Sequence, residues 1–339
     1  MKHYGVCLTC VLIVLLLASC ASLPKHVHVF ERSLSEGGLY YLDTCVECGY
    51  REVYVDEGLA ARCAPYFGLD SDISYIENPK TLEDYDNNIL FAALVGDYTP
   101  TIHFDTKKEL NSFIDEMFKE NYFHSKRDGR WFSRYHALVG TYGALLGYAT
   151  NQVQGYKVVS SKTGGYDLSV TISCFDLKHY PEGVPTEKDF FLQQLVALEQ
   201  AKAIHDKLHG DGYAGMQINE LTSDYEKMKI YNSFIRRGDS LVSSEYGLVK
   251  TDGIFAGLNQ LNSNCAGTEA LYTVFMHLEN LKAQTYSVEG HVISRVEADG
   301  NIVFYDYFSR DRYFSSDEDY TKRTGTGGIE YGEGCWLLF

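Results

Sequence analysis

Apolar residues recur at intervals of three or four positions in four segments of the chain, and this spacing predicts four helices. Three of these helices cover residues 106–122, 186–208 and 222–235. The fourth begins at Cys265, and its apolar residues from Ala270 to Leu278 recur on one face. We expect that face to pack on a sheet.

Strands are expected in two other parts of the chain, from alternation of apolar and polar residues in the first part and from a turn signal in the second. Residues 156–175 alternate around Gly164-Gly165, which is typical of a hairpin. Residues 284–288 form one further expected strand, and residues 291–297 and 302–307 flank Asp299-Gly300. Asp-Gly is a strong signal for a two-residue hairpin turn. The chain therefore combines helices with antiparallel strands, an α+β fold.

The second hairpin has a register that follows from its turn. If Asp299 and Gly300 are the two turn residues, Ile293 faces Asp306 across the pair of strands. His291 lies two positions before Ile293, on the same face as Asp306 and diagonal to it. Diagonal neighbours have Cα atoms about 7–8 Å apart, within reach of an imidazole–carboxylate hydrogen bond. A slip of one residue would put the two side chains on opposite faces.

Cys265 stands where a helix begins, which gives its thiol a special environment. Unpaired amide groups and the helix dipole favour a thiolate at this position. Together with His291 and Asp306 it supplies a nucleophile, a base and an orienting acid. We expect the Cys265 sulfur about 3–4.5 Å from one ring nitrogen of His291. The other nitrogen should hydrogen-bond Asp306 at about 2.6–3.2 Å.

Three short segments resemble the transglutaminase-like superfamily, in which a Cys opens a helix, a His opens a strand and an Asp closes the next strand. They are Asn-Cys-Ala-Gly-Thr-Glu-Ala at 264–270, Gly-His-Val at 290–292 and Gly-Asn-Ile-Val-Phe-Tyr-Asp at 300–306. Residues 223–227 and 246–249 fit as well, and the resemblance covers roughly residues 215–310. One departure is that Val292 and Ile293 follow the His, where family members often have an aromatic residue. This weakens any inference about the shape of the substrate site.

The resemblance implies a papain-like core, a nucleophile helix packed on an antiparallel sheet, with Cys265, His291 and Asp306 as catalytic residues. The implied activity is cysteine-dependent acyl transfer through a thioester, as a peptidase or a protein-glutamine transglutaminase. The partner would be a protein or peptide substrate, and catalysis would need no cofactor. The backbone N–H of Cys265 would help bind the oxyanion, with Gln260 or Asn264 as side-chain candidates. The alternative is an inactive domain that keeps the fold as a binding module at the cell surface.

Residues 1–19 have the pattern of a secretory signal: a basic start, an apolar middle and small residues at the end. The apolar run is too short for an ordinary membrane-spanning helix, which needs about 20 residues. Leu-Ala-Ser-Cys at 17–20 resembles the lipobox of bacterial lipoproteins, which implies that Cys20 carries acyl chains such as palmitate. The chain would then be exported and anchored to the bacterial membrane by its lipid. The alternatives are a plain signal peptide or an N-terminal anchor helix.

Residues 20–65 are expected to be a tether with a small zinc-ribbon-like unit. The segment contains His26, His28, Cys45 and Cys48, and it resembles the His-x-His … Cys-x-x-Cys-Gly segments of Gram-positive surface proteins. Two imidazoles and two thiolates suit tetrahedral zinc, which would help so short a segment to fold. Two alternatives stay open: a disulfide between Cys45 and Cys48, or a loose tether without a metal.

The 339 residues suggest about two domains plus shorter segments. We expect a mixed α/β region at 80–210, the catalytic domain at 215–315 and a C-terminal tail at 316–339. The net charge of −16 argues against nucleic acid as a partner, because phosphate binding depends on cationic side chains. Three cysteines receive no functional role: Cys63, Cys174 and Cys335. Four histidines are expected in packing or on the surface and likewise receive none: His103, His124, His136 and His205.

Overall fold

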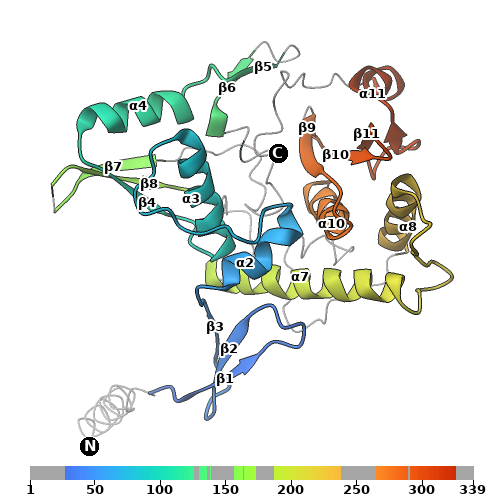
Figure 1. The fold of residues 1–339 in the computed structure, drawn as a ribbon, viewed down its shortest axis with the longest axis horizontal. Coiled ribbons are helices and arrows are strands. Elements are labelled where there is room, and N and C mark those ends of the chain that lie inside the picture. The colour runs from blue at the N-terminus through green and yellow to red at the C-terminus, as the bar shows by residue number, and fades with distance from the viewer. Residues whose placement is uncertain are drawn as a thin grey trace, which may run out of the picture. The chain divides into compact units, whose positions relative to one another are not determined.

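The computed structural model describes residues 27–125, 130–135, 138, 156–162, 164–172, 187–237, 265–288 and 291–325. The chain divides into two units. The first combines Met1–Ser35 with Tyr41–Tyr54, and the second combines Glu36–Tyr40 with Val55–Phe339. Helices and antiparallel sheets occur together, so the expected α+β class is confirmed (Figure 1). Among the described residues, none of the helices has the length and hydropathy that crossing a membrane requires.

The first unit contains one small antiparallel sheet in the order β1-β2-β3. Its strands are β1 (Phe30–Leu34), β2 (Tyr41–Cys45) and β3 (Arg51–Tyr54). Every residue of β1 is exposed, and within β2 and β3 only Cys45 and Val53 are buried. A unit with so little core depends on something other than hydrophobic burial for its stability.

The first half of the second unit has short helices and two small sheets. Its elements are α2 (Leu59–Cys63), η1 (Ala64–Phe67), α3 (Leu82–Leu94), β4 (Thr101–Phe104), α4 (Lys107–Met117), β5 (Phe123–Ser125), β6 (Arg130–Phe132), β7 (Tyr156–Ser160) and β8 (Tyr166–Val170). The hairpin expected around Gly164-Gly165 is confirmed by the antiparallel pairing of β7 with β8. The helix expected at 106–122 is α4, which ends earlier because Phe118 leaves the helix and packs against the ring of Tyr135.

The second half of this unit carries a four-stranded antiparallel sheet and longer helices. Its elements are α7 (Glu187–His209), α8 (Asp224–Arg236), α10 (Cys265–Leu278), β9 (Ala283–Val288), β10 (His291–Ala298), β11 (Asn301–Tyr305), β12 (Tyr313–Phe314) and α11 (Asp317–Thr324). The strand order is β12-β11-β10-β9. The helices expected at 186–208 and 222–235 correspond to α7 and α8, and both expectations are confirmed.

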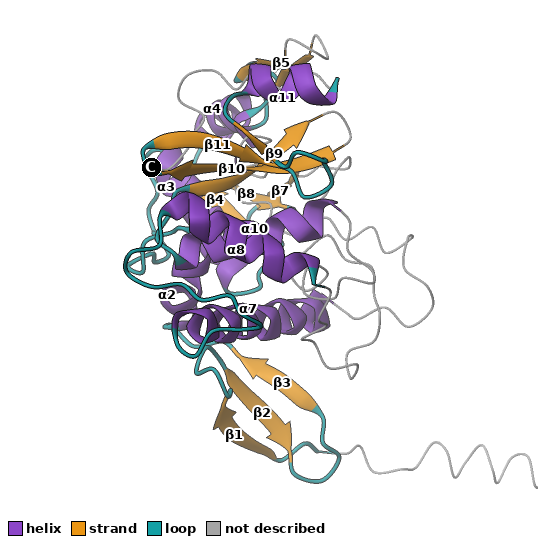
Figure 2. Ribbon diagram, turned by 90° about the vertical axis from the view of Figure 1, so that its right-hand side faces the viewer, coloured by secondary structure: helices purple, strands orange, loops and turns teal. Residues whose placement is uncertain are grey.

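Helix α10 lies at the centre of this half. It contacts β9 and β10 on one side and α7, α8 and η1 on the others (Figure 2). All residues from Gly267 to His277 are buried. The expected packing of α10 on a sheet is confirmed, but its buried surface is not limited to one apolar face, since the polar side chains of Thr268, Glu269 and Thr273 are buried as well.

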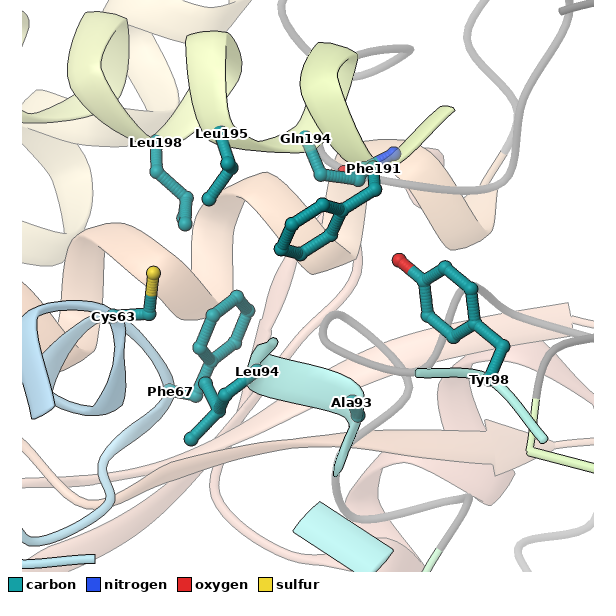
Figure 3. Close-up of a pocket in the computed structure, with 9 residues that line it drawn as sticks. All are labelled: Cys63, Phe67, Ala93, Leu94, Tyr98, Phe191, Gln194, Leu195 and Leu198. Carbon is teal, nitrogen blue, oxygen red and sulfur yellow. The ribbon is translucent and has the colours of Figure 1, made fainter. Parts of the chain in front are cut away.

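A small cavity lies where η1, α3 and α7 meet (Figure 3). The side chains of Phe67, Leu94 and Leu195 line it together with that of Phe191. Its volume is about 10 Å³, and a single water molecule needs about 10–15 Å³. We conclude that it is a packing defect and too small to hold a ligand.

Candidate active site

The β10–β11 hairpin has the register that the sequence predicts. Ala298 pairs with Asn301, and Ser294 pairs with Tyr305. Asp299 has φ +50° and Gly300 has φ +75°. Two left-handed residues at the centre of a two-residue loop are the requirement of a type I′ turn, which Asp-Gly satisfies at low cost.

The turn is also tied to the start of α8. The Asp299 carboxylate accepts hydrogen bonds from the backbone N–H groups of Asp224 at 3.0 Å and Tyr225 at 3.1 Å. Ser223 caps the same helix in a capping box. Its hydroxyl oxygen accepts a hydrogen bond from the backbone N–H of Glu226, and the Glu226 carboxylate accepts one from the backbone N–H of Ser223. Each cap stabilises a helix by about 1 kcal/mol. The hairpin is therefore held at its tip as well as along its strands.

His291 and Asp306 are in direct contact across this hairpin. The Nε2 atom of His291 lies 2.9 Å from Oδ1 of Asp306, within the range expected from the register. His291 also makes a side-chain hydrogen bond with Cys265. Because Nε2 faces the carboxylate, Nδ1 is the ring nitrogen left for the thiol. Cys265 is the first residue of α10 and packs against Val292.

The electrostatics of His291 favour a positively charged ring. Burial lowers the pKa of the imidazole, but the hydrogen bonds with Asp306 and Cys265 outweigh it and raise the pKa to about 10. An imidazolium beside a sulfur stabilises the thiolate form of that sulfur. The arrangement can therefore supply a charged nucleophile together with a proton donor.

Asp306 is almost completely buried and is held by several donors. Its Oδ1 accepts hydrogen bonds from the backbone N–H groups of Phe308 at 2.9 Å and Ser309 at 3.2 Å. Its Oδ2 accepts a hydrogen bond from the hydroxyl of Tyr320 at 3.2 Å. Tyr320 belongs to α11, in the segment that the sequence assigned to a tail. The start of that helix had a signal, since Ser316 is a good N-cap residue.

Glu269, one helical turn after Cys265, is a second residue that sequence reasoning missed. Its side chain is completely buried. One carboxylate oxygen accepts the backbone N–H of Tyr307 at 2.9 Å, and the other lies 2.5 Å from the hydroxyl of Ser294. Burial raises the pKa of Glu269 well above its usual range, and the nearby charge of Asp306 adds to the effect. Glu269 thereby links α10 to the residue next to Asp306.

The remaining expected residues of the catalytic site lie outside the described part of the chain. These are Gln260 and Asn264, the side-chain candidates for oxyanion binding. The segment at 246–249 and the lipidation residue Cys20 also lie outside it. The contacts described above are therefore those of Cys265, His291 and Asp306, the residues expected to form a triad, and of the groups around them.

Three of the four expected metal ligands come together in the first unit. The Nδ1 atom of His28 lies 3.4 Å from the sulfur of Cys48, and the ligand atoms of His28, Cys45 and Cys48 all lie within 4.8 Å of one another. The rings of Phe30 and Tyr50 pack on His28 at 5.5 and 4.9 Å. His26, the fourth candidate, lies outside the described residues.

These donors fit zinc. Tetrahedral zinc with bonds of about 2.0–2.3 Å places its ligand atoms about 3.4–3.8 Å apart. None of the four cysteines in the described ranges is in a disulfide, so Cys45 is not bonded to Cys48. Gly49 has φ +72°, and its N–H donates to the carbonyl of Cys45 at 2.9 Å. The left-handed conformation of Gly49 allows the chain to make a tight turn directly after Cys48.

A comparison of the chain with known protein families, curated proteins and solved structures finds no match. The function is therefore argued from the residues and contacts described above.

Proposed function

We propose that this chain is a cysteine-dependent acyl-transfer enzyme with a transglutaminase-like, papain-like core. Cys265 is the nucleophile, His291 the base and Asp306 the group that orients the imidazole. The observation that supports this proposal is the position of His291, which is hydrogen-bonded to Asp306 at 2.9 Å and to the side chain of Cys265. A triad is recognised by such geometry and roles rather than by the order of its residues.

The reaction would proceed in two balanced steps. The Cys265 sulfur attacks the carbonyl carbon of a peptide or glutamine amide, and the amine leaves with a proton from His291. A thioester remains on the sulfur. His291 then takes a proton from water or from a primary amine, which attacks the thioester and releases the acid or the new amide. Whether water or an amine takes the acyl group decides between a peptidase and a transglutaminase.

Two measurements on the full-length protein in detergent test this proposal. The first is the rate at which iodoacetamide alkylates each cysteine, located by mass spectrometry. Cys265 should react far faster than Cys63, which is a suitable internal control because burial raises the pKa of its thiol to about 12. The second is product analysis after incubation with peptides, with and without a primary amine.

The variants have distinct expected effects on turnover. Cys265→Ala should abolish it, and His291→Ala should do nearly the same. Asp306→Asn should have a milder effect, because it misorients the base without removing it. The losses should not add, because the three residues act as a unit. A slow, ordinary alkylation rate at Cys265 together with no turnover would favour the inactive binding module.

We also propose that the chain is exported and held on the membrane by acyl chains on Cys20. The Leu-Ala-Ser-Cys sequence at 17–20 supports this. Expression in a bacterium and the mass of the N-terminal peptide test it. The expected peptide begins at Cys20 with a lipid, and a Cys20→Ser variant should leave the membrane fraction. A chain that still begins at Met1 contradicts the proposal.

A further inference from the structure

A second cluster of metal-ligating side chains lies apart from both sites described so far. His205 and His209 are four residues apart on α7, and Glu279 directly follows α10. The ligand atoms of these three residues lie within 4.8 Å of one another. His205 was expected in packing or on the surface, and the fold gives it partners at ligand spacing that were not predicted from the sequence. One partner is close in sequence, and the fold brings the other from 74 positions away.

We propose that His205, His209 and Glu279 bind a divalent transition-metal ion, with zinc as the best match. Two imidazole nitrogens and one carboxylate oxygen are a common zinc donor set. Histidines at positions i and i+4 present both rings on one face of a helix. Here the rings lie side by side, with their centres 4.4 Å apart.

The distances suit a shared ion. The Nε2 atoms of both histidines point to the same oxygen, Oε1 of Glu279, at 3.5 Å from His205 and 2.7 Å from His209. Bonds of about 2.0–2.2 Å to a tetrahedral ion would set these separations near 3.3–3.5 Å. A widening of the shorter contact by under about 1 Å, which a rotation of the partly exposed His209 ring can supply, would complete three ligand positions.

Outer hydrogen bonds support both kinds of ligand. The Nδ1 atom of His205 lies 3.1 Å from a carboxylate oxygen of Asp206, which is itself held by Lys202 at 2.7 Å. Metal-bound histidines commonly donate their second ring N–H to a carboxylate, which fixes the ring. Glu279 is buried, and the hydroxyl of Tyr231 donates to its Oε1 at 2.6 Å.

One cation in the cluster offers an alternative without a metal. The ammonium group of Lys227 lies 3.5 Å from Oε2 of Glu279, so the carboxylate has a fixed counter-charge. However, Lys227 contacts the oxygen that the histidines do not face. The ammonium group and a metal ion would therefore occupy different sides of the carboxylate and would not compete for one position.

The position of the cluster indicates what the ion would do. Glu279 lies 14 residues after Cys265 along the same segment, a distance of about 21 Å in a helix. The ion would therefore take no part in the chemistry at Cys265. It would join the C-terminal end of the nucleophile helix to α7 and reduce the movement of α10 in the core. The site is in this sense structural, and it does not depend on the proposed function.

The experiment measures zinc by mass spectrometry in the full-length protein purified in detergent. With zinc also at the ligands expected in the first unit, His28, Cys45 and Cys48, the chain should hold about two zinc ions. Four variants separate the sites: His209→Gln, Cys48→Ser, the two combined, and His103→Gln as a matched control. His103 also pairs with a carboxylate, Asp167 at 2.7 Å, but it belongs to neither of the ligand clusters found in the described residues.

His209→Gln should lose one zinc ion, the combined variant should hold none, and His103→Gln should match the unaltered protein. If the first unit binds no zinc, Cys48→Ser will change nothing, and His209→Gln will still remove the one ion present. Cobalt gives a second readout, because only a site with thiolates adds sulfur-to-metal charge-transfer absorption. His209→Gln should bind less cobalt than the unaltered protein, but its sulfur-to-metal charge-transfer absorption should be unchanged, because the cluster contains no thiolate.

A second variant guards against misfolding. His205→Gln should lose the same ion, and circular dichroism checks that both variants are folded. Zinc at 100 times its Kd should raise the Tm of the metal-free protein by about 5–10 °C. In His205→Gln and His209→Gln this rise in Tm should be smaller, because zinc no longer binds at the cluster. Equal zinc content in the unaltered protein and His209→Gln, with no difference in their Tm response, would overturn the proposal.

Discussion

The hydroxyl of Tyr320 donates a hydrogen bond to Oδ2 of Asp306 at 3.2 Å. Both residues are buried, and Tyr320 is the point where α11 meets the proposed triad. The tyrosine thus holds the carboxylate from the side opposite to His291. An aspartate that orients an imidazole works best when its own position is fixed.

Tyr320→Phe tests this positioning role. The ring and its packing against Phe314 at 4.9 Å stay, while the hydroxyl is lost. We expect kcat to fall about tenfold with little change in KM, because a hydrogen bond to a charged group contributes at least about 1.5 kcal/mol. Tyr75→Phe is the control, since Tyr75 is half-exposed and packs only near Phe91. Equal kcat values for the two variants would exclude a positioning role for Tyr320.

Glu269→Gln tests whether the buried carboxyl group is neutral. Burial raises its pKa well above its usual range, so the folded protein binds a proton here more tightly than the unfolded chain. The free energy of unfolding should then fall as pH rises above about 4.5, the value for an exposed Glu. A glutamine has the same shape and no such penalty. The Tm of Glu269→Gln minus the Tm of the unaltered protein should therefore increase as the pH rises from 4.5 to 8.

Two controls make the Glu269 result specific. Glu269→Ala leaves the N–H of Tyr307 without its acceptor and creates a cavity, which should cost about 2–4 kcal/mol at pH 4.5 and less as the pH rises, because this variant also lacks the titrating group. Glu83→Gln changes an exposed glutamate on α3, and its Tm should follow that of the unaltered protein at each pH. A Tm difference between Glu269→Gln and the unaltered protein that does not vary with pH would contradict a raised pKa.

The sequence predicted well those features that depend on neighbouring residues. The Ser223 cap, the Asp299-Gly300 turn and the first residue of α10 each follow from side chains within a few positions. The register of β10 and β11 follows from the turn alone, which is why the pairing of His291 with Asp306 could be predicted.

Features that depend on distant contacts could not be predicted in this way. The burial of α10 from Gly267 to His277 arises from five different elements around it. Tyr320 reaches Asp306, and Glu279 reaches His209, only because the fold brings separate elements of the chain together. Spacing along the chain contains no information on such pairs. The papain-like arrangement of the core remains part of the proposal for the same reason.

The raised pKa of His291 predicts the alkaline limit of activity. Its hydrogen bonds with Asp306 and Cys265 outweigh burial and bring the pKa to about 10. The stability from the charged ring should be complete below about pH 6.5, the unfolded value, and should be lost as pH rises through 10. The Tm difference between the unaltered protein and His291→Gln should shrink over that range. In the pH profile of kcat/KM, activity should decline on the alkaline side near pH 10. In Asp306→Asn this decline should occur at lower pH.

The first unit provides the last prediction, which concerns the expected zinc ligands His28, Cys45 and Cys48. Because β1 is exposed throughout and the sheet buries few side chains, its stability should come largely from the metal. Cys48→Ser removes an exposed ligand without disturbing the buried Cys45. We expect it to lose one zinc ion and to become sensitive to trypsin at Arg51. A chelator should make the unaltered protein equally sensitive.

Arg32→Gln is the matched control for that experiment. It removes the ion pair with Asp43 at 2.7 Å and the contact of the guanidinium with the ring of Tyr54, but it keeps every ligand. Exposed pairs of this kind contribute about 0–1 kcal/mol, so cleavage at Arg51 should change little. Cleavage reports the open population of the unit when opening is faster than proteolysis. If Arg32→Gln opens the unit as much as Cys48→Ser does, strand contacts rather than a metal stabilise it, and the zinc proposal for this unit fails.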